Sequence, residues 1–181
     1  MKRAPATERD DADFHVECTL KRFPDIDPEV EGAVTRVHKL SRYLDRLMAD
    51  TTTEFGINPG EYRILVRLLS APERCLSPGQ LSTMLLISSG SMTNRLDRLE
   101  KAGLVVRKPD PKDRRAVLVE LTDTGAETIV AAVSKQGQRE AEVFNTLAPK
   151  DLARLNDLLR AIMIAFGERL GPLPPVSPPP D

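Results

Sequence analysis

Two short helical segments near the middle of the chain are separated by only a few residues. The first opens at Ser77, with Gln80 three positions later, and runs to about Leu85; the second begins near Ser88 or Ser89. The Ser-x-x-Gln spacing is that of a capping box, in which the two side chains satisfy free backbone N–H groups at the start of a helix. Two short helices joined this tightly predict a helix-turn-helix.

The second helix of this pair has one apolar face and one polar face. When residues advance by about 100° along a helix, Met92, Leu96 and Leu99 fall together on one side. A solvated surface is the commoner origin of such a polar face, but the small residues 88–91 let this helix end approach base edges and phosphates closely. We therefore expect this helix to read DNA. Its polar residues at and after this end are Ser88, Ser89, Ser91, Thr93, Asn94 and Arg98.

A charged loop between two strand-like segments follows this helix. Residues 105–108 and 117–121 flank the sequence PDPKDRR, which predicts an antiparallel β-hairpin. Residues 88–118 contain eight Lys or Arg and four acidic residues, a net charge of +4 in a chain whose total is −1. A solvated turn would also account for the loop. A basic patch on an acidic chain favours contact with phosphate, and a stiff basic loop suits the narrow minor groove. The loop residues concerned are Lys112, Asp113, Arg114 and Arg115.

Longer helices flank this central unit. Asp27 and Pro28 open the first of them, because Asp caps well and proline suits the first helical position. Asn58 opens the next helix as its cap, with Glu61 placed to reach back and form a second capping box. Two more helices are expected after the hairpin, the last of them from Pro149. Residues 1–13 and the proline-rich segment from Gly171 are expected to be disordered tails. The predicted fold is mainly α with a small antiparallel β-hairpin.

The sequence argues against a membrane, a cofactor and a catalytic site. Its longest apolar run is far shorter than the roughly 20 residues of a membrane-spanning helix, and its N-terminus does not resemble a secretory signal. Cys18 and Cys75 lack metal-ligand spacing with either His15 or His38. No glycine-rich phosphate loop follows a strand. We expect a cytoplasmic protein with reduced thiols, no cofactor and no bound metal.

The sequence resembles the MarR (multiple antibiotic resistance regulator) family. The resemblance is carried by SMTNRLDRLEKAGLV, by DPKDRR and the strand after it, and by LTDTG, and the matching order of helices extends it over residues 29–169. It implies a winged helix-turn-helix in a triangular homodimer that is held by its first and last helices. Such a dimer binds a pseudo-palindromic operator in double-stranded DNA.

The resemblance also implies roles for individual residues. Ser91, Asn94 and Arg98 would face the major groove, and Arg115 would enter the minor groove, oriented by Asp113. Lys112 and Arg114 would then hold the DNA backbone. The apolar terminal helices, with residues such as Ile162 and Phe166, suit a dimer, although completion of a monomer core is the alternative.

Family members often bind a small anionic or phenolic ligand between the dimerisation helices and the winged domain. Arg95 falls at the edge of the packed helix face and is the candidate for contact with such an effector; an ion pair with an acid of the first long helix is the alternative. The segment from Phe14 to Arg22 resembles an extended branch that includes urate-responsive members. That branch has a tryptophan in its pocket, and this chain contains none.

The chain is accordingly divided into five parts. These are an N-terminal extension, partly disordered (1–26), a first dimerisation helix (27–57), the winged helix-turn-helix core (58–122), the C-terminal dimerisation helices (123–170) and a disordered tail (171–181).

The expected function is that of a sequence-specific transcriptional regulator, a repressor of adjacent genes that a small ligand releases from DNA. One alternative is a thiol-based redox sensor of the same fold that uses Cys18. Another is a winged-helix module that binds protein instead of DNA.

Overall fold

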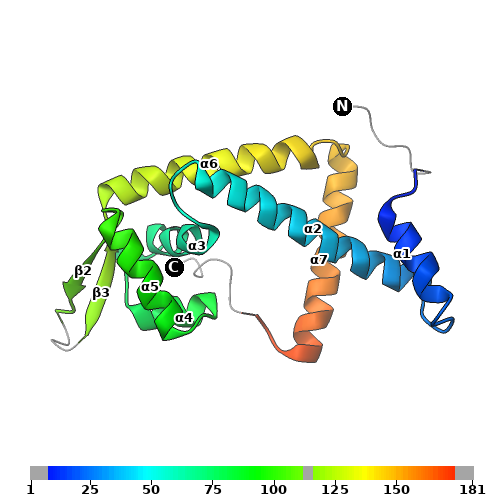
Figure 1. Ribbon diagram of the computed structural model, residues 1–181, viewed down its shortest axis with the longest axis horizontal. Helices are drawn as coiled ribbons and strands as arrows, with labels where there is room; N and C mark the ends of the chain where they lie inside the picture. The colour runs from blue at the N-terminus through cyan, green and yellow to red at the C-terminus, as the bar shows by residue number, and fades with distance from the viewer. Residues whose placement is uncertain (1–7, 112–115, 174–181) are drawn as a thin grey trace.

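The computed structural model describes residues 8–111 and 116–173. Two long helices lie side by side in it, a compact unit of short helices and a β-hairpin forms one end, and two further helices lie toward the other end (Figure 1). In chain order the elements are α1 (Asp11–Leu20), α2 (Pro28–Thr53), α3 (Pro59–Leu69), the 3-10 turn η1 (Pro72–Arg74), β1 (Cys75–Leu76), α4 (Pro78–Leu85), α5 (Ser89–Lys101), β2 (Val105–Pro109), β3 (Val117–Leu121), α6 (Asp123–Phe144) and α7 (Pro149–Leu170).

Local capping determines where the helices of the compact unit begin. Asn58 and Ser77 each accept backbone N–H bonds, and Glu61 and Gln80 bond back to them, so both predicted capping boxes are confirmed. These bonds satisfy N–H groups that have no partner within the helix. Gly103 follows α5 with a φ of 72°, a conformation that glycine adopts without strain.

The hairpin is confirmed, and it belongs to a slightly larger sheet. β2 and β3 pair antiparallel, from Val105 opposite Leu121 to Pro109 opposite Val117. The sequence predicted two strands, but β1 adds a third and the sheet order is β1-β3-β2. We missed β1 because it is only two residues long and its extended form depends on pairing with β3, which no local pattern reveals.

The prediction that residues 1–13 form a disordered tail was wrong for residues 10–13, which form the cap and first turn of helix α1. Asp10 caps α1 through a capping box with Asp13, so the helix begins at Asp11. The charges that made this segment resemble a tail instead bind it to α2. Arg36 of α2 pairs with Asp10 at 3.0 Å and with Asp13 at 2.7 Å, and Lys39 pairs with Asp11.

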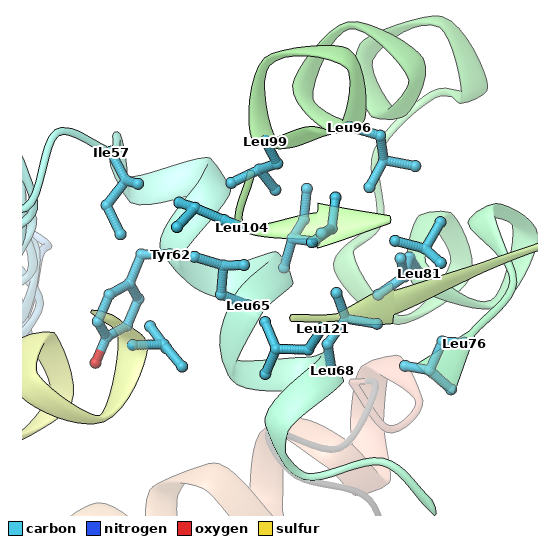
Figure 2. Close-up of a cluster of buried hydrophobic side chains, with 14 of the residues drawn as sticks. Ile57, Tyr62, Leu65, Leu68, Leu76, Leu81, Leu96, Leu99, Leu104 and Leu121 are labelled. Atoms are coloured by element: carbon cyan, nitrogen blue, oxygen red, sulfur yellow. The ribbon is translucent and has the colours of Figure 1, made fainter. Parts of the chain in front are cut away.

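The hydrophobic core lies inside the compact unit (Figure 2). Leu65 of α3, Leu81 of α4, Leu96 of α5 and Val119 of β3 are each at most 1% exposed. Burial of each such side chain stabilises the fold by about 1.5–3 kcal/mol. The shared core therefore fixes α5 against α3 and the sheet.

Ile129 extends the same core into α6, where it is fully buried. Helix α6 then runs along α2, away from the compact unit (Figure 1). Within the described residues, no helix combines the length and apolar character needed to cross a bilayer.

Candidate nucleic-acid interface

Helix α5 presents one polar face to solvent from the edge of the compact unit. Ser88 caps it by accepting the Ser91 N–H at 3.3 Å, and the helix is held from behind by Met92, Leu96 and Leu99, which are each 1% exposed. The first turn of this helix is therefore rigid, and its unpaired backbone N–H groups favour a nearby anion.

The predicted major-groove residues divide by exposure. Ser88, Ser89, Thr93 and Asn94 are exposed, whereas Ser91 is half-buried. Thr93 donates its hydroxyl to the Ser89 carbonyl at 3.0 Å, which leaves the hydroxyl oxygen able to accept. These side chains form a small polar surface at the start of α5.

Arg98 lies on the flank of α5 that faces α3. Its Nε is 2.9 Å from Oε1 of Glu61, and the Arg98 side chain is 68% exposed while that of Glu61 is only 3% exposed. The other carboxylate oxygen of Glu61 accepts the Asn58 N–H at 2.9 Å. Glu61 thus belongs both to the cap of α3 and to the surroundings of a predicted DNA-contacting residue.

Arg107 of β2 holds the opposite flank of α5. Its guanidinium pairs with Asp97 and with Glu100, each at 2.7 Å, and its backbone N–H donates to Glu100 at 3.1 Å. Partial burial works against the charged form, but the bonds to the two carboxylates outweigh it and raise the pKa of Arg107. The β2–β3 hairpin, which forms the wing, is therefore attached to α5 by charge as well as by the core.

Arg95 packs over the start of α3. A Cβ placed on Gly60 would lie 2.3 Å from an Arg95 Nη atom, so the guanidinium occupies the space that this glycine leaves open. Within residues 8–111 and 116–173, Arg95 forms no ion pair, and the proposed pair with an acid of the first long helix is not observed.

Thr122 and Gly125 connect the wing to α6. The Thr122 hydroxyl donates to the Gly103 carbonyl at 2.8 Å and accepts the Gly125 N–H at 2.9 Å, while the Thr122 N–H donates to the Leu104 carbonyl at 3.1 Å. These bonds give the LTDTG sequence its structural role. They join the end of the α5–β2 connection to the first turn of a long helix.

The loop residues Lys112, Asp113, Arg114 and Arg115 lie outside the described residues. Sequence reasoning did not single out Glu61 as an ion partner or Arg107 as a link between wing and helix. The capping pattern drew attention to Glu61, but only the fold brings it next to Arg98.

The two thiols lie in different parts of the molecule. Cys18 is exposed on α1, at the opposite end from the sheet that contains Cys75 (Figure 1). Burial raises the pKa of the Cys75 thiol, helped by the charge of Glu120, and this keeps the thiol protonated. Among the described residues no group of His, Cys, Asp or Glu is arranged to hold a metal ion.

Comparison with known proteins identifies the family. Residues 55–116 match the sequence model of the MarR family. The chain is also 31% identical over 138 residues to the HTH-type transcriptional regulator PecS of Dickeya dadantii, a match that covers 75% of the chain and 82% of PecS. The chain belongs to the MarR family.

Other members show the same relationship in sequence and in structure. The multiple antibiotic resistance protein MarR of Escherichia coli is 29% identical over 145 residues, which is 80% of this chain and 99% of MarR. A crystal structure of a MarR mutant complexed with operator DNA matches with a TM-score of 0.62 and 29% identity, over 77% of this chain and 99% of that chain. The predicted winged helix-turn-helix fold is confirmed, and this MarR-family chain is a DNA-binding transcriptional regulator.

Proposed function

We propose that this chain is a homodimeric repressor that binds a pseudo-palindromic operator and is released from it by a small anionic or phenolic ligand. The observation that carries the proposal is the polar first turn of α5, which is exposed to solvent and held from behind by the core. A rigid helix end of this kind fits the major groove with little reorganisation.

A dimer is supported by apolar surface that a single chain leaves exposed. α7 is 22 residues long and has no buried residue, although it carries Leu158, Ile162, Met163 and Phe166. α2 and α6 expose further apolar side chains at helical spacing, namely Val30, Val34, Val37, Val130 and Val133. Exposed apolar side chains in such number on long helices are characteristic of an interface.

Sedimentation tests the dimer directly. The expected species has twice the chain mass of 20.0 kDa. Ile162→Glu places a charge on the exposed face of α7 and should shift the protein toward monomer and weaken operator binding, whereas Lys150→Glu, near the start of the same helix, should not. A monomeric wild type that binds a palindrome tightly would refute the dimer.

The proposed DNA contacts are those of α5 and of the wing. Ser88, Ser89, Ser91, Thr93, Asn94 and Arg98 are assigned to the major groove. The loop residues Lys112, Asp113, Arg114 and Arg115 are assigned to the backbone and the minor groove. Arg115→Ala should weaken binding most where the operator flanks are A·T-rich, because a narrow groove attracts the guanidinium.

A salt titration separates specific from general contact with DNA. Affinity is measured for the operator found by a binding footprint, for a flank-substituted operator and for a scrambled duplex. Each lost phosphate contact should reduce the salt slope by roughly 0.9. Equal weakening of all three duplexes by Arg115→Ala would make the wing a non-specific anchor, and no weakening would refute its assignment to DNA.

The effector is proposed to bind beside Arg95, at the junction of α5 and α3. A ligand there would shift the spacing between the two α5 helices of the dimer. A coupling free energy of about 1–3 kcal/mol between ligand binding and DNA binding corresponds to a roughly 5- to 150-fold loss of affinity for the operator. Two open hollows of about 410 and 480 Å³ lie elsewhere, along α1 and α2. The larger is lined by Lys39, Arg42, Tyr43 and Arg46 of α2 and by Asp11 of α1, which pairs with Lys39. Its lining is net cationic and suits an anion.

Two variants locate the effector, with salicylate as the probe anion. Arg95→Ala should abolish the release of DNA by the ligand, and Arg42→Ala should leave it unchanged. The reverse result would move the site to the hollow between α1 and α2. A reporter gene placed behind the operator tests repression, since expression should rise when the protein is deleted.

The redox alternative lacks a second observation in its favour. Cys18 is exposed, but no thiol lies near enough on the described part of the chain to form an internal disulfide with it. Peroxide should therefore leave operator affinity unchanged in the wild type. Loss of binding in the wild type but not in Cys18→Ser would establish the redox alternative instead.

A further inference from the structure

Glu61 is a buried carboxylate whose two oxygens have different neighbours. Oε2 accepts the Asn58 N–H at 2.9 Å and completes the cap of α3. Oε1 has no hydrogen-bond partner among the described atoms, and its compensating charge is Arg98, whose Nε lies 2.9 Å away. An ionised carboxylate that is 3% exposed requires such a charge, because removal from water penalises it.

The contact leaves most of the Arg98 guanidinium free. A guanidinium has five N–H donors, and its terminal pair forms the fork that suits a phosphate or a guanine edge. The Nε is the atom nearest to Glu61, and the Arg98 side chain remains 68% exposed. Glu61 therefore holds the inner end of the group while its outer end faces solvent.

We propose that Glu61 is a positioning residue for DNA recognition, which holds Arg98 of α5 so that the terminal guanidinium nitrogens face the major groove. This inference rests on the proposed assignment of Arg98 to DNA. A long flexible side chain loses rotamer freedom when it binds. The pairing with Glu61 imposes that loss during folding, so less remains to be lost when the operator is bound.

The position of Glu61 makes this role separable from the cap. Glu61→Gln keeps a carbonyl oxygen for the Asn58 N–H but turns an amide NH₂ toward Arg98, so it preserves the cap and removes the tether. Asn58→Ala is the matched control, because the Asn58 side chain accepts the N–H groups of Gly60 and Glu61, whereas the ion pair of Arg98 is made with Glu61. Loss of the cap side chain alone should lower stability without altering base preference.

The experiment is a double-variant cycle on the dimeric protein, with wild type, Glu61→Gln, Arg98→Ala and the double variant. Each is titrated with the footprinted operator, with operators substituted at each symmetric base pair, and with a scrambled duplex. Glu61→Gln should weaken operator binding about 2- to 13-fold, the equivalent of ordering one flexible side chain. The loss should concern the same base pair as Arg98→Ala, and the double variant should bind no more weakly than Arg98→Ala.

Two results would overturn the proposal. Additive losses in the cycle would show that Glu61 acts independently of Arg98, and equal weakening on the scrambled duplex would show a general effect on folding. A wild type that fails to prefer its operator over the scrambled duplex would instead refute the proposed function, which distinguishes the two failures.

A second measurement does not depend on the stability of the variants. NMR relaxation of the Arg98 Nε–H in the free wild-type protein should give an order parameter close to that of rigid backbone, about 0.85. A value below about 0.6, typical of a flexible group, would show that Glu61 does not hold Arg98 and would also refute the proposal.

Discussion

Gly125 occupies the tightest glycine site at the junction between the wing and α6. A Cβ at this position would lie 2.1 Å from the Leu104 carbonyl oxygen and 2.8 Å from Cδ1 of Leu121. The carbonyl oxygen belongs to the backbone and accepts the Thr122 N–H at 3.1 Å, so it cannot move away without breaking that bond. Gly125→Ala is therefore a severe change although it adds a single methyl group.

The cost can be worked from these distances. The added Cβ falls about 1.3 Å short of ordinary contact at 3.4 Å, so α6 must shift away from the wing. Overpacking of this kind costs about 1–3 kcal/mol, and loss of the Thr122 bond adds about 0.5–1.5 kcal/mol. The better helix propensity of alanine offsets at most about 1 kcal/mol. These ranges give an expected net loss of about 0.5–3.5 kcal/mol, centred on about 2 kcal/mol.

Urea unfolding at a fixed protein concentration measures this loss. With a slope of about 1–3 kcal/mol per molar urea, the midpoint should fall by roughly 1 M. Gly137→Ala is the control, because Gly137 lies in the same helix and nothing lies within 4 Å of its added Cβ. It should raise stability by about 0.5–1 kcal/mol. Equal stability of the two variants would refute the assigned close contact.

Three further outcomes follow from the structure. Gly90 is exposed in the first turn of α5 with open space around it; Gly90→Ala should leave stability unchanged or slightly higher and weaken operator binding in a fluorescence anisotropy titration, and unchanged affinity would place the DNA elsewhere. A thiol reagent at about pH 8, near the ordinary thiol pKa, should label exposed Cys18 before Cys75, whose pKa is raised by burial. The protonated Cys75 thiol is favoured in the folded state, so its contribution to the free energy of unfolding should be lost as the pH rises through the raised pKa. Equal labelling rates would contradict the burial of Cys75. Arg36→Ala should speed hydrogen exchange in α1, because Arg36 pairs with Asp10 at the start of that helix. The bond from Arg36 lowers the pKa of Asp10, so the docking of α1 in the wild type should also weaken as the pH falls into the carboxylate range. Unchanged exchange in Arg36→Ala would show that the charges do not hold α1.

The boundaries of the elements were largely predictable because their causes are local. A side-chain cap acts within three residues of a helix start, so Asp27, Asn58 and Ser77 could be recognised from the local sequence. The hairpin was equally visible, since alternation along a strand is a property of adjacent residues. The start of α1 was missed because composition was weighed above the capping pattern of Asp10 and Asp13.

The surroundings of the functional side chains were not predictable in the same way. Glu61 and Arg98 are far apart in the chain, and their charges meet only because α3 and α5 pack on one core. The same holds for Arg95 above Gly60, and for the short strand β1, which exists through its pairing with β3.

The sequence by itself determined the order of the longer helices and the hairpin, most of the helix caps, the basic central segment and the resemblance to the MarR family, because each depends on neighbouring residues. The tertiary structure alone decided which charged residues of α3 and β2 pair with those of α5, and which apolar helix faces remain exposed. Arg107 is attached to Asp97 and Glu100, and α7 has no buried residue in one chain. Both are consequences of packing between distant segments, where burial and distance set the energy of a side chain.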